Sequence, residues 1–311
     1  MTLMQTLKIS RPIIQAGMVW VSGGKLAAAA ANAGCLGVIG AGSMKPDLLR
    51  EHILKAQGLT NKSLAVNVPL LYEKSEEQIH SALAYGIKIF ITSAGSPKKF
   101  TQRLKSAGCT VLHVVSTPDL ARKCEEAGVD AVIAEGFEAG GHNGRDELTT
   151  MALIPQVVDC VKIPVVAAGG IGDGRAIAAA LSLGAECVQM GTRFIATHEA
   201  SAHENFKQLL LKASPTDTML MMKRSVPVRL FKNKFYDEIK AAEEKCADKS
   251  ELEKILGRGR AKLGMLEGNL DEGEIEIGQI AGLVKDVVSV EELVDRLMVE
   301  YHQTIKELPK F

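Results

Sequence analysis

One rhythm runs through the first two thirds of the chain and constrains its fold more than any other feature. From residue 12 to about 213, short apolar runs rich in β-branched residues alternate with helical patterns of Ala and Leu. The apolar runs are Pro12–Ile14, Leu36–Ile39, Leu64–Val68, Ile87–Thr92, Thr110–Val115, Ala131–Ala134, Pro164–Ala167 and Cys187–Met190. The helical patterns are Ser22–Ala33, Lys45–Gly58, Ser75–Tyr85, Lys98–Ala107, Thr117–Ala127, Thr150–Val158, Gly174–Leu183 and Ser201–Ala213. Eight such units predict an α/β protein with a (β/α)8 TIM barrel, and a doubly wound sheet is the rival.

Local signals support this division of the chain. Thr117-Pro118-Asp119 places a cap residue before a proline at the first helical position, and several helices end at an Ala-Gly pair. The apolar runs are short and uninterrupted, which is typical of parallel strands that are buried on both faces.

The last third of the chain breaks the rhythm. We therefore expect a barrel domain over residues 1–214 and a smaller, mostly helical extension over residues 215–311 that caps the barrel mouth. Helical spacing appears in Asp237–Leu256 and Val290–Leu308. Two readings are open for the basic segment of this region, solvated surface charge or a patch that attracts anionic partners. The residues of the basic segment are Arg224, Arg229, Lys232, Lys234, Arg258, Arg260 and Lys262.

Composition excludes several functional classes. The 37 Lys and Arg residues balance 37 Asp and Glu residues, so the chain lacks the basic excess that nucleic-acid binding requires. No apolar run reaches the roughly 18 residues of a membrane span, and the N-terminus shows no secretory signal. The six cysteines are scattered without a CxxC pair, as expected of reduced thiols. We expect a cytoplasmic protein that contacts neither nucleic acid nor membrane.

In a parallel barrel, the residues that carry chemistry follow the carboxyl ends of the strands. The seventh strand is followed by Ala168-Gly169-Gly170 and the eighth by Gly191-Thr192. Glycine lets a backbone N–H approach an anion, and the last two loops of such barrels commonly bind phosphate. Tight turns alone are the alternative, but two glycine-containing loops on adjacent strands favour phosphate. The first strand lacks a GxGxxG fingerprint, so a dinucleotide in a Rossmann crevice is not expected.

His142 is the main candidate for acid–base chemistry. It lies in a long loop between Gly140-Gly141 and Gly144, where no helix or strand pattern buries it. An imidazole there can exchange a proton near neutral pH, whereas the bland alternative is a surface histidine. Among the acidic residues of this loop, only Glu135, at the strand end, is expected to point into the mouth, whereas Glu138, Asp146 and Glu147 are expected to be solvated loop charges. No spacing of histidines or cysteines predicts a metal site.

Several phrases together carry a resemblance to a known family. They are PIIQAGMVWVSGGKLAAAAANAGCLGVIGAGS, AVNVPLLY, TSAGSP, AEGFEAGGHNGRDE, PVVAAGGIGDGRA, GAECVQMGTRF and SAHENFK. They closely resemble the FMN flavoproteins of the nitronate monooxygenase and enoyl-acyl-carrier-protein reductase II superfamily, over essentially the whole chain. The C-terminal phrases RLFKNKFY, LGRGRAK and EIGQIAGL look more like the enoyl reductase II branch.

The resemblance implies FMN in the barrel mouth and a homodimer. Ala16, Gly17 and Met18 would line the isoalloxazine ring, Asn67 would hydrogen-bond its polar edge, and Gly140 would sit beside it. His142 falls on the catalytic histidine of the family. The phosphate would be held by Gly169, Gly170, Gly191 and Thr192, which the strand-end argument also selects. The cofactor-binding set is completed by Glu135, Ala168 and Gln189.

Three functions follow from this resemblance and stay open at this stage. The first is an enoyl-acyl-carrier-protein reductase of fatty acid synthesis that uses NADPH or NADH and reduces a trans-2-enoyl thioester, either as a small molecule or linked to the carrier. The second is a nitronate monooxygenase that oxidises alkyl nitronates with O₂ and needs no nicotinamide. The third is a non-catalytic FMN- or phosphate-binding protein with a degenerate site, which the intact His142 and glycines disfavour.

Overall fold

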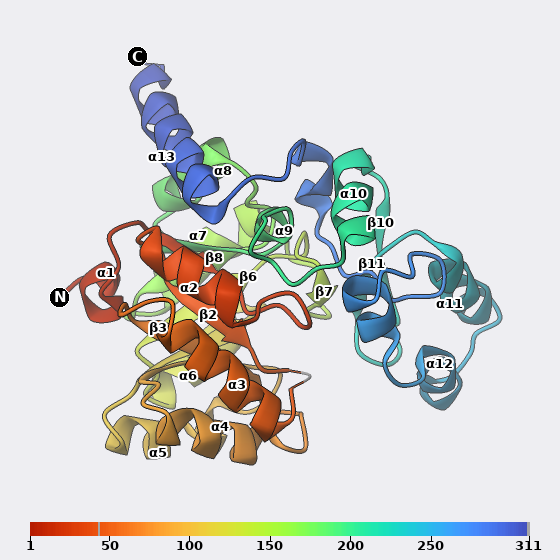
Figure 1. Ribbon diagram of the computed structural model, residues 1–311, viewed down its shortest axis with the longest axis horizontal. Helices are drawn as coiled ribbons and strands as arrows, with labels where there is room; N and C mark the ends of the chain where they lie inside the picture. Colours follow the sequence, from red (N-terminus) through yellow and green to blue (C-terminus); the bar gives the residue numbers. More distant parts are fainter. Residues whose placement is uncertain (43, 310–311) are drawn as a thin grey trace.

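The computed structural model describes residues 1–42 and 44–309 and confirms the barrel (Figure 1). Eight parallel strands form one sheet in the order β1-β9-β8-β6-β5-β4-β3-β2, whose two edges meet at a parallel bridge between Ile14 and Leu36. The barrel strands are β1 (Ile13–Gln15), β2 (Gly37–Gly40), β3 (Leu64–Pro69), β4 (Ile89–Ser93), β5 (Thr110–Val115), β6 (Ala131–Glu135), β8 (Val165–Ala168) and β9 (Cys187–Met190). They match the eight predicted runs to within about two residues at each end.

Helices surround the sheet, as the alternation predicts. They are α2 (Gly24–Asn32), α3 (Pro46–Gln57), α4 (Ser75–Ala84), α5 (Thr101–Ser106), α6 (Pro118–Glu126), α7 (Thr150–Cys160), α8 (Gly174–Ser182), α9 (Thr192–Ile195) and α10 (Glu204–Lys212). The predicted cap at Thr117 is present, because its side chain accepts a hydrogen bond from the Leu120 N–H. No helix within the described residues is long and apolar enough to cross a bilayer.

The barrel interior is a packed core. Inward-facing side chains of the strands form one apolar cluster that includes Ile14, Val38, Ile91 and Ile133. A short N-terminal helix that was not predicted, α1 (Leu3–Leu7), adds its two buried leucines to the same cluster. The lumen is therefore closed at the amino ends of the strands, which leaves the carboxyl ends as the open mouth.

A glutamine side chain completes the seam between β1 and β2. The Gln15 N–H donates to the Leu36 carbonyl at 2.9 Å, but the next amide along β2, that of Val38, has no backbone partner on β1 and donates instead to the Gln15 side-chain oxygen at 3.1 Å. Gln15 is fully buried, so this bond satisfies an amide that water cannot reach.

The C-terminal region combines helices with two short strands that were not predicted. Its elements are β10 (Thr218–Met221), β11 (Val228–Phe231), α11 (Lys234–Glu244), α12 (Lys249–Leu256) and α13 (Val290–Glu307). The strand β11 pairs with β10 and also with β7 (Gly141–His142), a two-residue strand in the loop after β6. In Figure 1, α11 and α12 form a lobe at the mouth, whereas α13 runs back over the barrel and packs on α8 and α2.

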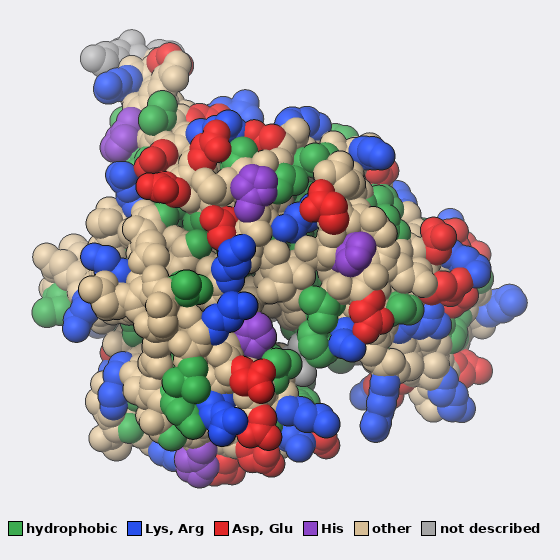
Figure 2. All heavy atoms as spheres, in the orientation of Figure 1, with side chains coloured by type: hydrophobic (Ala, Val, Ile, Leu, Met, Phe, Trp, Pro, Cys, Tyr) green, Lys and Arg blue, Asp and Glu red, His purple; other side chains and the backbone are tan. Residues whose placement is uncertain are grey.

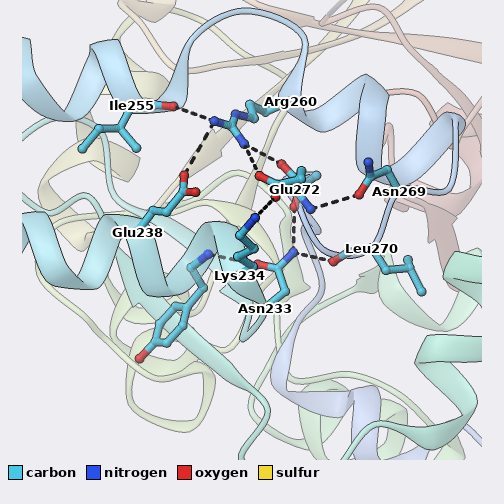
Figure 3. A network of polar contacts seen from close by, with 10 residues as sticks. Asn233, Lys234, Glu238, Ile255, Arg260, Asn269, Leu270 and Glu272 are labelled. Atoms are coloured by element: carbon cyan, nitrogen blue, oxygen red, sulfur yellow. Dashed lines mark hydrogen bonds and ion pairs between the residues drawn. The ribbon is translucent and has the colours of Figure 1, made fainter.

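The basic segment is not a set of free surface cations. Arg260 donates to the Glu272 carbonyl and also forms ion pairs with Glu272 and Glu238, while Lys234 pairs with Glu272 (Figure 3). Arg224 and Lys232 donate to backbone carbonyls. On the face drawn in Figure 2, basic and acidic side chains are intermixed. Most of these charges therefore join parts of the C-terminal region to each other.

Candidate active site

The predicted cofactor residues gather at the carboxyl edge of the barrel. Strand residues just before this edge are almost fully buried, whereas nine of the predicted residues at the edge are partly exposed. These nine are Ala16, Gly17, Met18, Asn67, Glu135, Gly140, Gly169, Gly170 and Gly191. The other predicted residues, Ala168, Gln189 and Thr192, are buried directly behind them. The structure thus brings the whole predicted set to one opening.

Two neighbouring turns form the predicted phosphate site. Ala168 lies opposite Gln189 in the paired strands β8 and β9, so the turn at Gly169-Gly170 sits beside the turn at Gly191-Thr192. Gly169 and Gly170 have φ of 83° and 67°, values that favour glycine. Among the described residues, no acceptor takes the amide N–H of Gly170, Gly191 or Thr192. Adjacent unpaired amides fit a bound anion such as the phosphate of FMN.

The C-terminal region fastens this site from outside the barrel. The Gly278 N–H donates to the Thr192 hydroxyl oxygen at 2.9 Å, which leaves the hydroxyl proton available to a ligand. Next to it, Arg193 is 8% exposed and pairs with Asp286 at 2.6 Å. The sequence did not predict these contacts of Gly278 and Asp286, because both residues lie more than 80 positions after the loop that they contact.

Glu138 is not a solvated loop charge, as its position in an acidic loop suggested. Its carboxylate accepts hydrogen bonds from the Thr150 N–H and hydroxyl at about 3 Å, which caps the N-terminus of α7. The Thr150 hydroxyl also lies 2.9 Å from the Gly169 carbonyl oxygen. Glu138 and Gly170 line a cavity of about 260 Å³ at this side of the mouth. The Thr150 hydroxyl therefore lies between the loop after β6 and the loop after β8, within hydrogen-bond distance of an acceptor from each.

The opposite side of the mouth fits a flat ring. A Cβ added to Gly17 would lie 2.5 Å from the Asn67 Cβ, so only glycine lets the loop after β1 lie against the end of β3. The Asn67 amide nitrogen donates to the Ile91 carbonyl at 3.3 Å, which fixes the plane of its side chain. Its partly exposed side-chain oxygen remains available to a ligand. These contacts fit the predicted platform for an isoalloxazine ring.

His142 lies on the C-terminal sheet, not on the barrel. It is exposed in β7, opposite Val228, and the neighbouring Gly141 pairs with Arg229. Arg229 is 1% exposed, donates to the Phe137 carbonyl at 2.9 and 3.1 Å, and stacks on the Phe137 ring. Burial lowers the pKa of this guanidinium. Arg229 thereby clamps the loop that carries His142 to the extension.

Three carboxyl groups have pKa values raised by their surroundings, and of these only Glu135 was predicted to belong to the site. Glu274 is 6% exposed, whereas Glu135 and Glu276 are partly exposed. Burial raises the pKa of Glu135 to about 7. Burial also raises the pKa of both Glu274 and Glu276, and the Glu276 charge adds to the rise at Glu274. The acidic, glycine-rich composition of residues 264–282 was visible in the sequence, but nothing in it placed this segment beside His142. Within the described residues, no group of three or more His, Cys, Asp or Glu side chains could hold a metal ion.

We expect the cofactor-free protein to lose stability as the pH rises from about 6.5 to 8.5. In this window the folded protein keeps protons on Glu135 and Glu274, whose pKa values are about 7 and about 8, whereas the unfolded chain has released them. Stability falls with pH wherever the folded state binds more protons, here by on the order of 2 kcal/mol. The buried His113, with a pKa lowered to about 4, no longer contributes above pH 6.5.

Urea unfolding at several pH values measures this loss. The Glu135→Gln variant has no proton to retain, so its stability should fall less steeply than that of the wild type. A stability that is flat or rises between pH 6.5 and 8.5 would contradict the assignment of protonated carboxyls to the mouth.

Comparisons with known proteins agree with this geometry. The family profile described as nitronate monooxygenase matches residues 1–83 and 71–300. A probable nitronate monooxygenase of Staphylococcus haemolyticus is 38% identical, covering 70% of this chain and 74% of its own. A protein of Rhodococcus jostii is 29% identical, and the match covers 98% of this chain and 97% of the relative. It is named a (3aS,4S,5R,7aS)-5-hydroxy-7a-methyl-1-oxo-octahydro-1H-indene-4-carboxyl-CoA dehydrogenase. The solved structure of FabK from Thermotoga maritima superposes with a TM-score of 0.94 at 39% identity, covering 99% and 98%.

Proposed function

Because this chain belongs to the nitronate monooxygenase family of oxidoreductases, we propose that it binds FMN and reduces trans-2-enoyl thioesters with NADPH or NADH. FMN is typical of this family and of FabK. When bound, FMN supplies hydride transfer between the nicotinamide and the substrate. The nitronate monooxygenase reaction is the alternative for the same site.

The observation that carries the proposal is the likeness to FabK over the full chain. FabK is an enoyl-acyl-carrier-protein reductase II, and its structure matches both the barrel and the extension, with 39% identity. The Staphylococcus haemolyticus monooxygenase is of similar identity but spans 70% of this chain. The likeness therefore favours the reductase among the functions of the superfamily.

The charge of the mouth also supports a neutral substrate. Among the described residues, neither Glu135 nor Glu276 forms an ion pair or accepts a hydrogen bond, and desolvation raises the pKa of both carboxyls. A nitronate brings a negative charge to these carboxyls, whereas the double bond of an enoyl thioester brings none.

The residues of the chain have separate tasks in the proposed reaction. The turns at Gly169-Gly170 and Gly191-Thr192 hold the phosphate, while Gly17 and Asn67 contact the ring. The β-carbon of the enoyl group accepts a hydride and the α-carbon a proton, so the product is the saturated thioester. His142, exposed on β7, supplies that proton or orients the thioester.

Anaerobic mixing tests the proposal. The purified protein should release free FMN on heating, because the site holds a terminal phosphate by backbone amides and no covalent link is needed. Addition of NADPH or NADH should bleach the flavin absorbance quickly, and addition of a trans-2-enoyl-CoA should restore it with formation of the saturated acyl-CoA. The variant Gly86→Ala, changed far from the mouth, serves as a matched control.

Two results would contradict the proposal. Slow bleaching by both nicotinamides, together with turnover of propionate 3-nitronate in air, would assign the monooxygenase activity instead. Release of FAD, or flavin that stays attached to denatured protein, would reject the FMN site itself.

A further inference from the structure

One side chain closes the turn that carries His142. The half-buried Asn143 donates its carboxamide N–H groups to the Ala139 carbonyl at 2.8 Å and, with a longer bond, to the Gly141 carbonyl at 3.4 Å. Because Ala139 lies four residues earlier in the loop after β6, a single carboxamide spans the whole turn. Gly141 has a φ of 79° within this span, which lets the chain fold back toward Ala139.

The backbone of Asn143 is held from the other side by the extension. Its N–H donates to the Pro227 carbonyl at 2.9 Å, which continues the pairing of β7 with β11 by one position. Proline has no N–H to donate in return, so this ladder can go no further. Asn143 therefore joins two supports of the turn, its backbone to β11 and its side chain to Ala139.

The imidazole of His142 depends on this backbone for its direction. The side chain is exposed, and among the described residues no hydrogen bond or ion pair holds its ring nitrogens. The point and the direction at which the ring leaves β7 are therefore set by the closed turn and by the pairing with β11.

We propose that Asn143 is a positioning residue, whose carboxamide fixes the backbone from which His142 meets the substrate. The inference rests on the proposed function, in which His142 serves the protonation step. A displacement of about 1 Å in a reacting group can cost about 10²-fold in rate, so a residue that closes the turn affects turnover without contact to the substrate.

The variant Asn143→Asp tests the donor with an almost unchanged shape. At neutral pH a carboxylate cannot donate and faces two carbonyl oxygens, so kcat should fall about tenfold while FMN content and the KM for NADPH stay unchanged. The facing oxygens raise the pKa of the new carboxyl above its ordinary value of about 4, and the protonated acid can donate again. The ratio of variant to wild-type kcat should therefore rise between about pH 8 and about pH 5. A ratio that stays constant or falls would overturn the proposal.

A double-mutant cycle tests whether Asn143 acts through His142. Asn143→Ala should lower kcat about tenfold in the wild-type background but by less than about twofold in the His142→Ala background. Equal losses in both backgrounds would contradict a positioning role. The matched control is Asn32→Asp, at the last residue of α2 and thus at the opposite end of the barrel. The Asn32 carboxamide also donates to a backbone carbonyl, that of Leu59 at 3.1 Å, but kcat should stay at the wild-type value.

Amide hydrogen exchange of residues 139–143 does not depend on the reaction. In Asn143→Ala this segment should exchange about tenfold faster than in the wild type, because the turn opens without its side-chain bond, whereas Asn32→Asp should leave it unchanged. Unchanged exchange in Asn143→Ala would reject the role of the carboxamide even if the enzyme reduces enoyl thioesters. Faster exchange in an enzyme that oxidises nitronates would reject only the proposed reaction.

Discussion

The His142→Ala variant is expected to keep its fold and its FMN but to lose about 10²-fold or more in turnover. This is the usual scale for the loss of a positioned acid–base group. Folding should be little affected, because the side chain is exposed and β7 is held by backbone pairing with β11. Steady-state kinetics with an enoyl-CoA, together with the flavin absorbance per protein, measure both parts of the prediction.

The control for this variant is His302→Ala. His302 is an exposed histidine on α13, which packs on the outside of the barrel, so its replacement should leave turnover unchanged. Near-normal turnover in His142→Ala would remove this residue from the mechanism. A His142→Ala protein that fails to fold would show that the residue is structural.

The Gly169→Ala variant is expected to lose its FMN. A methyl group at this position would lie 2.6 Å from the Gly136 carbonyl oxygen, and the residue has a φ of 83°. The strained backbone alone costs about 1–3 kcal/mol, and the clash with the loop after β6 must move one of the two turns. A displaced turn loses an amide contact to the phosphate, and a hydrogen bond to a charged group contributes about 1.5–3 kcal/mol, so the dissociation constant for FMN should rise by about tenfold to 10²-fold.

Fluorescence titration of the cofactor-free protein with FMN measures this effect. The matched control is Gly86→Ala, because Gly86 has a φ of 79° but no atom within 4 Å of an added Cβ. The strained backbone of Gly86→Ala should lower the midpoint of unfolding, but the variant should bind FMN with the affinity of the wild type. Equal FMN affinity in both variants would mean that the turn at Gly169 does not contact the phosphate.

The barrel could be predicted because its signals are local. Each parallel strand is buried on both faces and reads as a short apolar run, and several helices end at a glycine. The positions of the turns at Gly169-Gly170 and Gly191-Thr192 were predictable for the same reason, since these turns directly follow two adjacent strands. The helical pattern of residues 237–256 was read as one unit, but Asp248 caps a second helix after a left-handed Cys246.

The missed features are contacts between distant segments. The strand β7 has two residues and pairs with a strand about 85 residues later, so no periodicity can reveal it. Arg229 reads as one charge of a basic segment, yet it is buried against the Phe137 carbonyl. Glu276 and Gly278 acquire their neighbours only when the extension folds back over the mouth. The sequence shows that charged residues and glycines are present in these segments, but it does not show which of them contact each other in the folded protein.

The small sheet of β10, β11 and β7 means that the barrel and the extension are interleaved. The extension supplies β11, the pairing partner of the strand that bears His142. The extension of a relative therefore cannot replace this one through a single junction after residue 214. A chimera would have to carry residues 137–145 together with the donor extension, so that Arg229 still meets the Phe137 carbonyl. A change in either of these two stretches of sequence must therefore be matched by the other if the small sheet is to form.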